Sequence, residues 1–489
     1  RIIYQSSGEN IYRIFFPGDF FMYEMTDSAS ENSGHFAGVI GPERNFDIIN
    51  KKINIGQRAT QLFMIDGFTK DEIMEKLIES LIALKPEDIP QKAGDFVKLV
   101  PYIDVTPKST LKEAVDYLLM GMVCMFVDGY KCCFVIDCRT YPARSVSEPW
   151  KDRVLRGSRD GFVESIVANV TLIRRRIRTP DFCVEIMNAG TMSNTDIAFA
   201  YIQGKADMKL LANLKKRVEK IKVEALTMNI ESLAEVLLRG PFINPFPKFK
   251  YSERPDSAAA SIYDGNIVIL IDNSPAVLVL PTSVFDVIEE ADDYYFPPLT
   301  GTYIKLSKYL LTIMSLIMTP LWIVFLRNPG MVPEWFKFIM IEEGSTVPVI
   351  LQLLILEFCI DGLRLAAVNT PTLLTTPLSI IAGIVVGEYA VSSGWFDPES
   401  MLYMAFVTVG TYTQASYELG YAIKFFRMIM LILAWFFGIW GFAAGIVMFV
   451  LAMAFNRTIS EKSYLYPLIP FDGKMLARKL LRLRLGKEK

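Results

Sequence analysis

The sequence predicts a cytoplasmic α/β region of two similar α/β subdomains, followed by an α-helical transmembrane domain. Charged residues occur throughout the chain up to about Tyr303, whereas long uncharged runs follow that point. Such a change separates a water-exposed part from a membrane part. The order of strand, helix and hairpin also occurs twice before Tyr303, according to the spacing of apolar residues. Together these two patterns give the fold class.

The first α/β subdomain is predicted over 45–145. Residues 60–84 have the pattern of a strand, a tight turn and an amphipathic helix. Residues 123–138 are typical of a β-hairpin that turns at Asp128 and Gly129.

The second α/β subdomain is predicted over 181–300 and has the same order of elements. A strand, a turn and a helix are expected over 197–221, and a hairpin over 266–281 that turns at 273–275. A cleft between two such subdomains is a candidate ligand or partner site. The alternative is that common α/β elements resemble each other by chance.

An N-terminal extension is predicted over 1–44, and a connector of a turn and a helix is predicted over 146–180, between the subdomains. The stretch at 154–182, which includes most of this connector, reads VLRGSRDGFVESIVANVTLIRRRIRTPDF. Its Gly157 and Gly161 match neither spacing of a phosphate-binding loop, so we interpret them as a structural turn. The helix after them is expected to pack through an apolar face and to end at Pro180. Its arginines complement the helix dipole and can reach carboxylates of another subdomain or subunit, or lipid headgroups. The candidates for such interdomain or intersubunit contacts are Arg156, Arg159, Arg174, Arg175, Arg176 and Arg178.

Composition disfavours several classes of function. The formal net charge of -2 argues against a general nucleic-acid binder. The single histidine, His35, leaves no Ser-His-Asp or Cys-His arrangement, and the six cysteines form no CxxC pair. We therefore expect no enzyme, no cofactor and no metal site, with the cysteines as buried free thiols.

The transmembrane domain is predicted over 301–460, because a helix needs about 20 apolar residues to cross a bilayer. The uncharged runs are 309–326, 344–356, 365–387, 400–417 and 428–455. All but the second are long enough to span. We expect four full spans and one re-entrant or interfacial segment at the second run, that is, about four to five membrane segments.

Charged residues near these runs are candidates for a pore or for intramembrane pairing. Glu357, Asp361 and Arg364 lie on one helical face, where they can pair or line a wet cavity. The alternative is the solvated end of an amphipathic helix. Glu388 directly follows the uncharged run at 365–387, and in a symmetric ring it would favour cations. The alternative is a glutamate near a helix end that reaches the interface.

Two pairs of glycines are spaced four apart in the apolar runs, Gly383 with Gly387 and Gly441 with Gly445. This spacing lets helices approach closely, either within one subunit or between subunits.

The flanks of the membrane domain are basic, which predicts a cytoplasmic location for both. Lys305 and Lys308 precede the first span, and the tail over 461–489 is basic. Lys424 and Arg427 favour the cytoplasm as well, which conflicts with a simple count of spans. The basic side chains of the tail are Lys474, Arg478, Lys479, Arg482, Arg484, Lys487 and Lys489.

The sequence resembles the GerA family, the A subunits of bacterial spore germinant receptors, and within it the SpoVAF branch. The resemblance covers roughly 45–475. One departure is at Gln414 and Ala415, where the family usually has a proline, so the kink of that proline is not implied. The matching motifs are the connector sequence above, NPFPKFKYSERPDSAAASIYDGNIVILIDNSPAVLVLP at 244–281, LEFCIDGLRLA at 356–366, GTYTQASYELG at 410–420, SYELGYAIKFFRM at 416–428 and SYLYPLIPF at 463–471.

This resemblance implies a spore inner-membrane protein that forms homo-oligomers, such as pentamers, around a pore for monovalent cations. It also implies a role in responding to or amplifying the germination signal, with a small membrane protein and other germination proteins as partners. Membrane lipids are a further expected partner. The competing hypothesis is a non-conducting membrane scaffold or sensor that docks other proteins through its cytoplasmic subdomains.

Overall fold

The computed structural model describes residues 23–140, 157–238, 244–341, 345–370, 380, 383–456, 458–460 and 463–482. The chain divides into two compact units. The first unit comprises residues 1–239 and 251–281, and the second comprises residues 240–250 and 282–489. In the described parts, the first unit contains the α/β elements and the second contains long helices.

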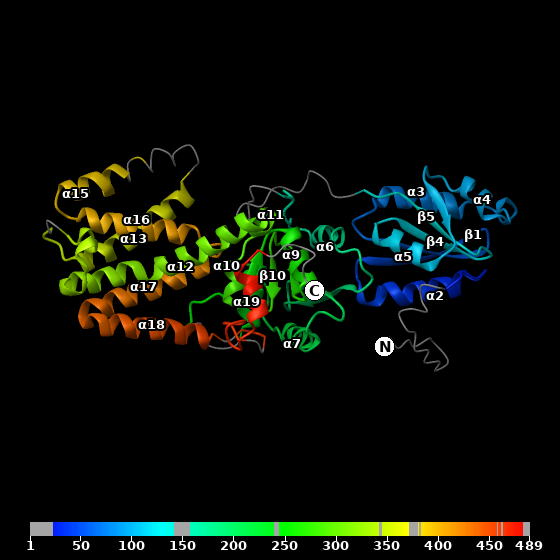
Figure 1. Ribbon diagram of the computed structural model, residues 1–489. Helices are drawn as coiled ribbons and strands as arrows, with labels where there is room; N and C mark the ends of the chain where they lie inside the picture. Colours follow the sequence, from blue (N-terminus) through cyan, green and yellow to red (C-terminus); the bar gives the residue numbers. More distant parts are fainter. Residues whose placement is uncertain are drawn as a thin grey trace. The chain divides into compact units, whose positions relative to one another are not determined.

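The first α/β subdomain is a five-stranded sheet in the order β1-β2-β4-β5-β3, in which every strand pairs antiparallel with its neighbours. Helices lie on both faces of this sheet (Figure 1). The strands are β1 (Ile48–Ile55), β2 (Arg58–Ile65), β3 (Val105–Lys108), β4 (Val123–Val127) and β5 (Cys133–Ile136). The helices are α2 (Ala29–Ile40), α3 (Asp71–Ile82), α4 (Ala93–Phe96) and α5 (Leu111–Leu119).

Alternation of side chains along the strands makes two cores around this sheet. Leu62 and Met64 of β2 belong to the core that α3 and α4 cover. Phe63 and Ile65, one residue on, belong to the core that α2 and α5 cover. The central strand β4 is buried along its whole length for this reason, and it reads as a continuous apolar run.

The second α/β subdomain has the equivalent strand order, β6-β7-β9-β10-β8. Helices α6 and α9 share a core with one face of the sheet, and an ion pair between Lys215 and Glu185 places α7 against the other face. The strands are β6 (Phe182–Ala189), β7 (Thr195–Ile202), β8 (Lys250–Ser252), β9 (Ile267–Ile271) and β10 (Val277–Leu280). The helices are α6 (Ile166–Arg174), α7 (Met208–Val218), α8 (Ile230–Leu237) and α9 (Pro255–Tyr263).

A matching set of polar contacts begins α2 and α6, the first described helix of each subdomain. The hydroxyl of Ser28 accepts the N–H of Glu31, and that of Ser165 accepts the N–H of Ala168. The amide nitrogen at the start of each helix donates to an aspartate in the last hairpin of its sheet. These bonds are Ala29 N to Asp128 Oδ1, 3.1 Å, and Ile166 N to Asp272 Oδ1, 3.2 Å.

A buried asparagine one turn further on completes the match. The side chain of Asn32 accepts a hydrogen bond from the backbone N–H of Thr26 and donates one to the carbonyl of the same residue. Asn169 makes the same two bonds to Val163. The predicted fold class, two similar α/β subdomains followed by a helical region, is therefore confirmed. The repeat also makes α6, predicted as part of a connector, the first helix of the second subdomain. Likewise α2, which falls in the predicted N-terminal extension, packs in the core of the first subdomain.

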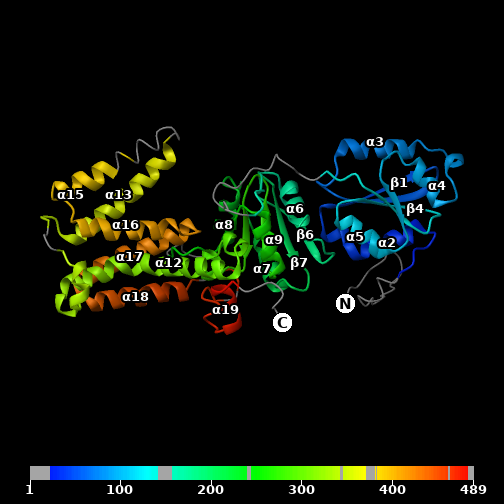
Figure 2. The same ribbon diagram turned by 45° about the horizontal axis from the view of Figure 1, so that its top comes forward.

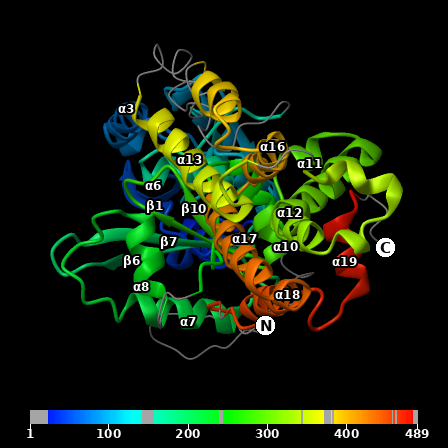
Figure 3. The ribbon, with the colours of Figure 1, turned by 90° about the vertical axis from the view of Figure 1, so that its left-hand side faces the viewer.

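The second unit is built from long helices (Figure 3). Helix α12 packs against α16 and α17, and α17 packs against α18. The helices are α10 (Val284–Ile288), α11 (Asp292–Tyr295), α12 (Pro298–Arg327), α13 (Val349–Asn369), α15 (Ala390–Ser392), α16 (Pro398–Tyr412), α17 (Tyr417–Phe437), α18 (Ile439–Ala454) and α19 (Gly473–Leu480). Short 3-10 turns follow α12 at Pro329–Met331 and Glu334–Ile339, and a π-helical segment spans Gly383–Tyr389.

The uncharged run over 428–455, expected as one span, is divided between two helices, because the helix breaks at Gly438. This residue has φ 61° and ψ -134°, a region that favours glycine. The chain reverses there, and α18 returns alongside α17 (Figure 2). Gly441 and Gly445 face α17, where an added Cβ would meet Leu433 and Met430. These two glycines thus allow close packing of two helices of the same chain. At Gly383 and Gly387, by contrast, nothing lies within 4 Å of an added Cβ.

Two of the described helices, α12 and α17, are long and apolar enough to cross a membrane, and α18 is apolar but shorter. Helix α13 was expected as a re-entrant or interfacial segment. It has 21 residues, about 31 Å of helix, and carries three charged residues. The expected span over 365–387 includes 371–379, 381 and 382, which lie outside the described residues. The number of membrane segments stays a prediction.

The predicted basic tail contains a helix, α19, that docks on the segment before α12. Lys479 Nζ lies 2.6 Å from Asp286 Oδ1 and 3.0 Å from Glu289 Oε2. Lys305 Nζ lies 2.8 Å from the other oxygen of Glu289. Burial by itself raises the pKa of Glu289, but the charges of Lys479, Lys250 and Lys305 lower it well below its usual range.

Candidate functional site

Two of the three predicted charged residues of α13 pair with two basic residues of α17. Arg427 donates to both oxygens of Glu357, from Nε at 2.5 Å and from a terminal nitrogen at 2.9 Å. Lys424 Nζ lies 2.5 Å from Asp361 Oδ2 and 3.4 Å from Glu357 Oε2. We call these four residues the ion-pair cluster. Arg427 also donates to the carbonyl of Ser315 on α12, 2.8 Å away, so the cluster touches three helices.

Burial makes the ion-pair cluster a strong constraint on the helix bundle. Glu357 and Arg427 are each 2% exposed and Lys424 is 5% exposed. An unpaired charge at such a position is costly, so removing one partner leaves a large penalty on the other. Lys424 and Arg427 are thus buried in ion pairs and are not free at the surface.

Arg364, the third predicted charge of α13, lies outside the ion-pair cluster. Its guanidinium is 5.0 Å from the ring centre of Tyr412, 4.9 Å from that of Tyr417 and 5.5 Å from that of Tyr421. A narrow crevice of about 20 Å³ connects Arg364 with the cluster along α13, α16 and α17. Spacing thus correctly placed the three charges on one face, and the structure gives them different partners.

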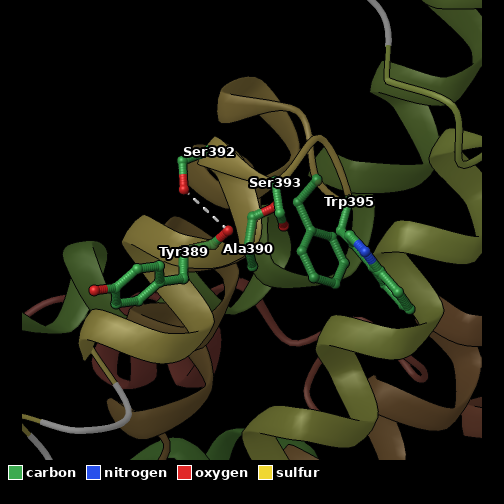
Figure 4. A pocket seen from close by; sticks show the side chains of 6 residues that line it. Tyr389, Ala390, Ser392, Ser393 and Trp395 are labelled. Atoms are coloured by element: carbon green, nitrogen blue, oxygen red, sulfur yellow. Dashed lines mark hydrogen bonds between the residues drawn. The ribbon is translucent and has the colours of Figure 1, made fainter.

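Glu388 lies apart from the ion-pair cluster, in the π-helical segment. Its side chain is exposed, and no described residue forms a hydrogen bond or ion pair with it. The residues that directly follow Glu388 in the sequence line a shallow hollow of about 350 Å³ (Figure 4). There the hydroxyl of Ser392 donates to the carbonyl of Tyr389, and Trp395 forms part of the rim. The hollow is open and lined mainly by aromatic and serine side chains.

Arg174, one of the predicted arginines, lies against another subdomain. It forms a bidentate ion pair with Asp47, with one of the two bonds at 2.8 Å, and donates to Asn45 Oδ1 at 2.9 Å. Arg174 and Asp47 are each 1% exposed. Asn45 Oδ1 also accepts the N–H of Val184, 2.9 Å away, and so joins the first subdomain to β6. That this contact is needed for assembly stays a prediction.

The other predicted arginines have different surroundings. Arg176 pairs with Asp160 at 2.5 Å, within its own segment. Arg178 donates from Nε to the carbonyl of Arg175. Arg159 is exposed, and Arg156 lies outside the described residues. Of the two turn glycines, Gly157 has φ 117°, whereas Gly161 is buried.

Sequence reasoning missed three residues that complete these contacts. Lys424 and Arg427 were interpreted as topology signals, although their spacing of three places them on one helical face. Asp47 had no local signal, because a lone aspartate before a polar edge strand is unremarkable in sequence. No group of three His, Cys, Asp or Glu side chains that could hold a metal occurs in the described part of the chain.

A family model, Bacillus/Clostridium GerA spore germination protein, matches residues 40–489. The chain belongs to the GerA family. The family resemblance predicted from the motifs is thereby confirmed, and it gives the chain a role related to spore germination. The match covers both α/β subdomains and the helical region, so it includes the ion-pair cluster and Glu388.

Two individual proteins and one solved structure illustrate what the chain is similar to. Stage V sporulation protein AF of Bacillus subtilis is 35% identical over 456 residues, which cover 93% of this chain and 92% of that protein. The uncharacterized membrane protein YfkQ of Bacillus subtilis is 27% identical, over 83% of this chain and 80% of that protein. The N-terminal domain of the A subunit of the Bacillus megaterium spore germinant receptor GerK3 is 25% identical, with a TM-score of 0.41. It covers 53% of this chain and 96% of that structure.

Proposed function

We propose that this GerA-family chain is a subunit of a homo-oligomeric monovalent-cation channel, such as a pentamer, that responds to or amplifies the germination signal. The observation that carries the proposal is the contrast between Glu388 and the ion-pair cluster. The carboxylates of Glu357 and Asp361 are occupied by Lys424 and Arg427, whereas Glu388 is exposed on a single chain. Repeated around a symmetry axis, an exposed carboxylate forms an acidic ring that favours cations.

The helical unit supports a location in a membrane, which we propose to be the spore inner membrane. Large apolar side chains are exposed along α12, α16, α17 and α18, a surface that suits lipid. Basic residues gather at the start of α12 and on α19, which favours a cytoplasmic location for that end and for the α/β subdomains. As partners we propose further copies of this chain, a small membrane protein and other germination proteins.

The test is cation flux through the purified full-length chain in liposomes. We expect potassium flux from the wild type, and reduced flux with a weaker preference for cations from Glu388→Gln. Glu334→Gln is the matched control, because Glu334 is also an exposed carboxylate of the helical unit. Unchanged flux and selectivity in Glu388→Gln would remove Glu388 from the pore.

Images of the purified protein in nanodiscs test the oligomer separately. We expect a ring of several copies around one axis, and a stable monomer would count against a channel. If no preparation conducts at any oligomeric state, the scaffold hypothesis takes its place. In that case the two α/β subdomains would dock other germination proteins.

A further inference from the structure

The polar residues around the ion-pair cluster contain one more positive charge than negative charges. The cluster itself is balanced, with two carboxylates and two basic side chains in contact. Arg364 lines the same crevice and has no carboxylate within salt-bridge distance among the described residues. The crevice therefore has a surplus cation at the position of Arg364.

The contacts of Arg364 leave the edges of its guanidinium available. Three tyrosine rings lie around it at 4.9 to 5.5 Å, and such rings stabilise the charge through the face of the π-system. A guanidinium has five N–H donors, and an aromatic ring does not satisfy them as an oxygen acceptor does. No described residue accepts a hydrogen bond from Arg364, so an oxyanion is the group that would complete its coordination.

The location of Arg364 fits the interface level of a bilayer. Gln414, which follows α16, bonds to Thr312 in the middle of α12, one helical turn after Lys308. This end of α16 therefore lies near the start of the uncharged run at 309–326. That end of the helices also carries Lys305 and Lys308. Tyrosines are typical of the level at which lipid headgroups lie, and basic sites between helices bind such headgroups.

We propose that Arg364, held by Tyr412, Tyr417 and Tyr421, binds a phosphoryl oxyanion. A guanidinium forms two parallel hydrogen bonds with a phosphate group, which a lysine ammonium cannot reproduce. The crevice beside it, about 20 Å³, has room for about one water molecule, so the phosphoryl group lies at the mouth and not inside. An anionic lipid headgroup and inorganic phosphate share this chemistry. The site does not depend on whether the chain conducts ions.

The test measures lipid and phosphate binding by the full-length protein. The wild type is placed in micelles of an uncharged maltoside detergent, which carries no phosphoryl group, alone or with added phosphatidylglycerol. The thermal unfolding midpoint is recorded in each. Inorganic phosphate is titrated in a parallel series without phosphatidylglycerol. The variants are Arg364→Gln and Arg364→Lys, with Lys337→Gln as the control, because Lys337 is an exposed basic residue that follows α12.

We expect phosphatidylglycerol to raise the midpoint of the wild type and of Lys337→Gln, with affinity lowered about tenfold or more in Arg364→Gln, as for lost charge-assisted bonds. Arg364→Lys retains the charge and should bind several-fold more weakly, which tests the proposal even if Arg364→Gln does not fold. An Arg364-dependent effect of inorganic phosphate alone would identify free phosphate as the ligand. Equal responses of the wild type and both Arg364 variants to lipid and to phosphate would overturn the proposal.

Discussion

The two α/β subdomains share a strand order and a set of capping contacts, yet they differ at the far end of the first helix. Counting from the matching residues Asn32 and Asn169, the position of Arg174 in α6 corresponds to Ala37 in α2. Arg174 reaches Asp47 and Asn45 of the first subdomain. Ala37 has no side chain that could make such a contact. The shared residues therefore serve the fold of each subdomain, whereas the residue that differs serves the contact between them.

The largest expected effect comes from Arg174→Met, which would leave Asp47 buried without its partner. We expect a loss of about 3–5 kcal/mol, as for breaking one side of a buried ion pair. Hydrogen exchange should accelerate at the N–H groups of Phe46 and Val184, which bond across the contact. Arg159→Met, at an exposed arginine of the predicted connector, is the control. Unchanged exchange in Arg174→Met, together with intact assembly and germination, would contradict this role.

A smaller, local effect is expected from Asn32→Ala and Asn169→Ala. Each removes two bonds that hold the chain entering its helix, at a cost of about 1–3 kcal/mol. Faster exchange should stay within α2 for the first variant and within α6 for the second. If either variant loosened both subdomains equally, the proposed separation between fold residues and contact residues would be wrong.

The serine caps test whether equivalent positions have equivalent energies. Ser28→Ala and Ser165→Ala should each cost about 1 kcal/mol, because each removes one N-cap hydrogen bond. Thermal unfolding of the full-length chain measures both. Ser30→Ala, at an exposed position inside α2, provides the comparison. A difference of several-fold between the two caps would show that the match is geometric only.

The last effect is absent at neutral pH and grows as the pH rises, and it should distinguish the first subdomain from the second. Burial raises the pKa of both Cys132 and Cys138, in the first subdomain, to about 11. A thiol in an unfolded chain has a pKa of about 8.5. Because the folded pKa is raised, the stability that these neutral thiols contribute is complete below about pH 8.5 and is lost as the pH rises to about 11.

The measurement is near-ultraviolet circular dichroism of melting at pH 7.5 and pH 10. The wild type should lose stability between these values, and the double variant Cys132→Ala with Cys138→Ala should lose less. Cys183→Ala is the counterpart in the second subdomain, where burial also raises the thiol pKa. Equal losses in the wild type and the double variant would exclude the two thiols as the cause.

The buried parts of the α/β fold were predictable because burial leaves a strong pattern in sequence. Strands β4, β9 and β10 are buried along their whole length, and their hairpin turns carry Asp128-Gly129 and Asn273. The edge strands β1 and β3 were missed, since β1 is mostly exposed and β3 contains a proline. Their place in the sheet depends on pairing with distant residues, which no local pattern specifies.

The candidate site was predictable in part for a related reason. Helical spacing places Glu357, Asp361 and Arg364 on one face, but it does not name the helix they meet. Lys424 and Arg427 carried that information only in combination with the packing of α13 against α17. The break at Gly438 was missed because a glycine is also tolerated inside an apolar helix, and only its backbone angles distinguish a turn.

Helix α19 is synthesised last in the helical unit, and its contacts can form only after the rest of that unit has left the ribosome. Lys479 neutralises Asp286 and Glu289, which lie almost two hundred residues earlier in the chain. A ribosome that adds about 5–20 residues per second needs roughly 10–40 s to travel between them. During that interval Glu289 has Lys305 close by but lacks the second ammonium that Lys479 brings. A chain that ends prematurely, even by a few tens of residues, would therefore lack the ion pairs that Lys479 forms with Asp286 and Glu289 just before the first long helix.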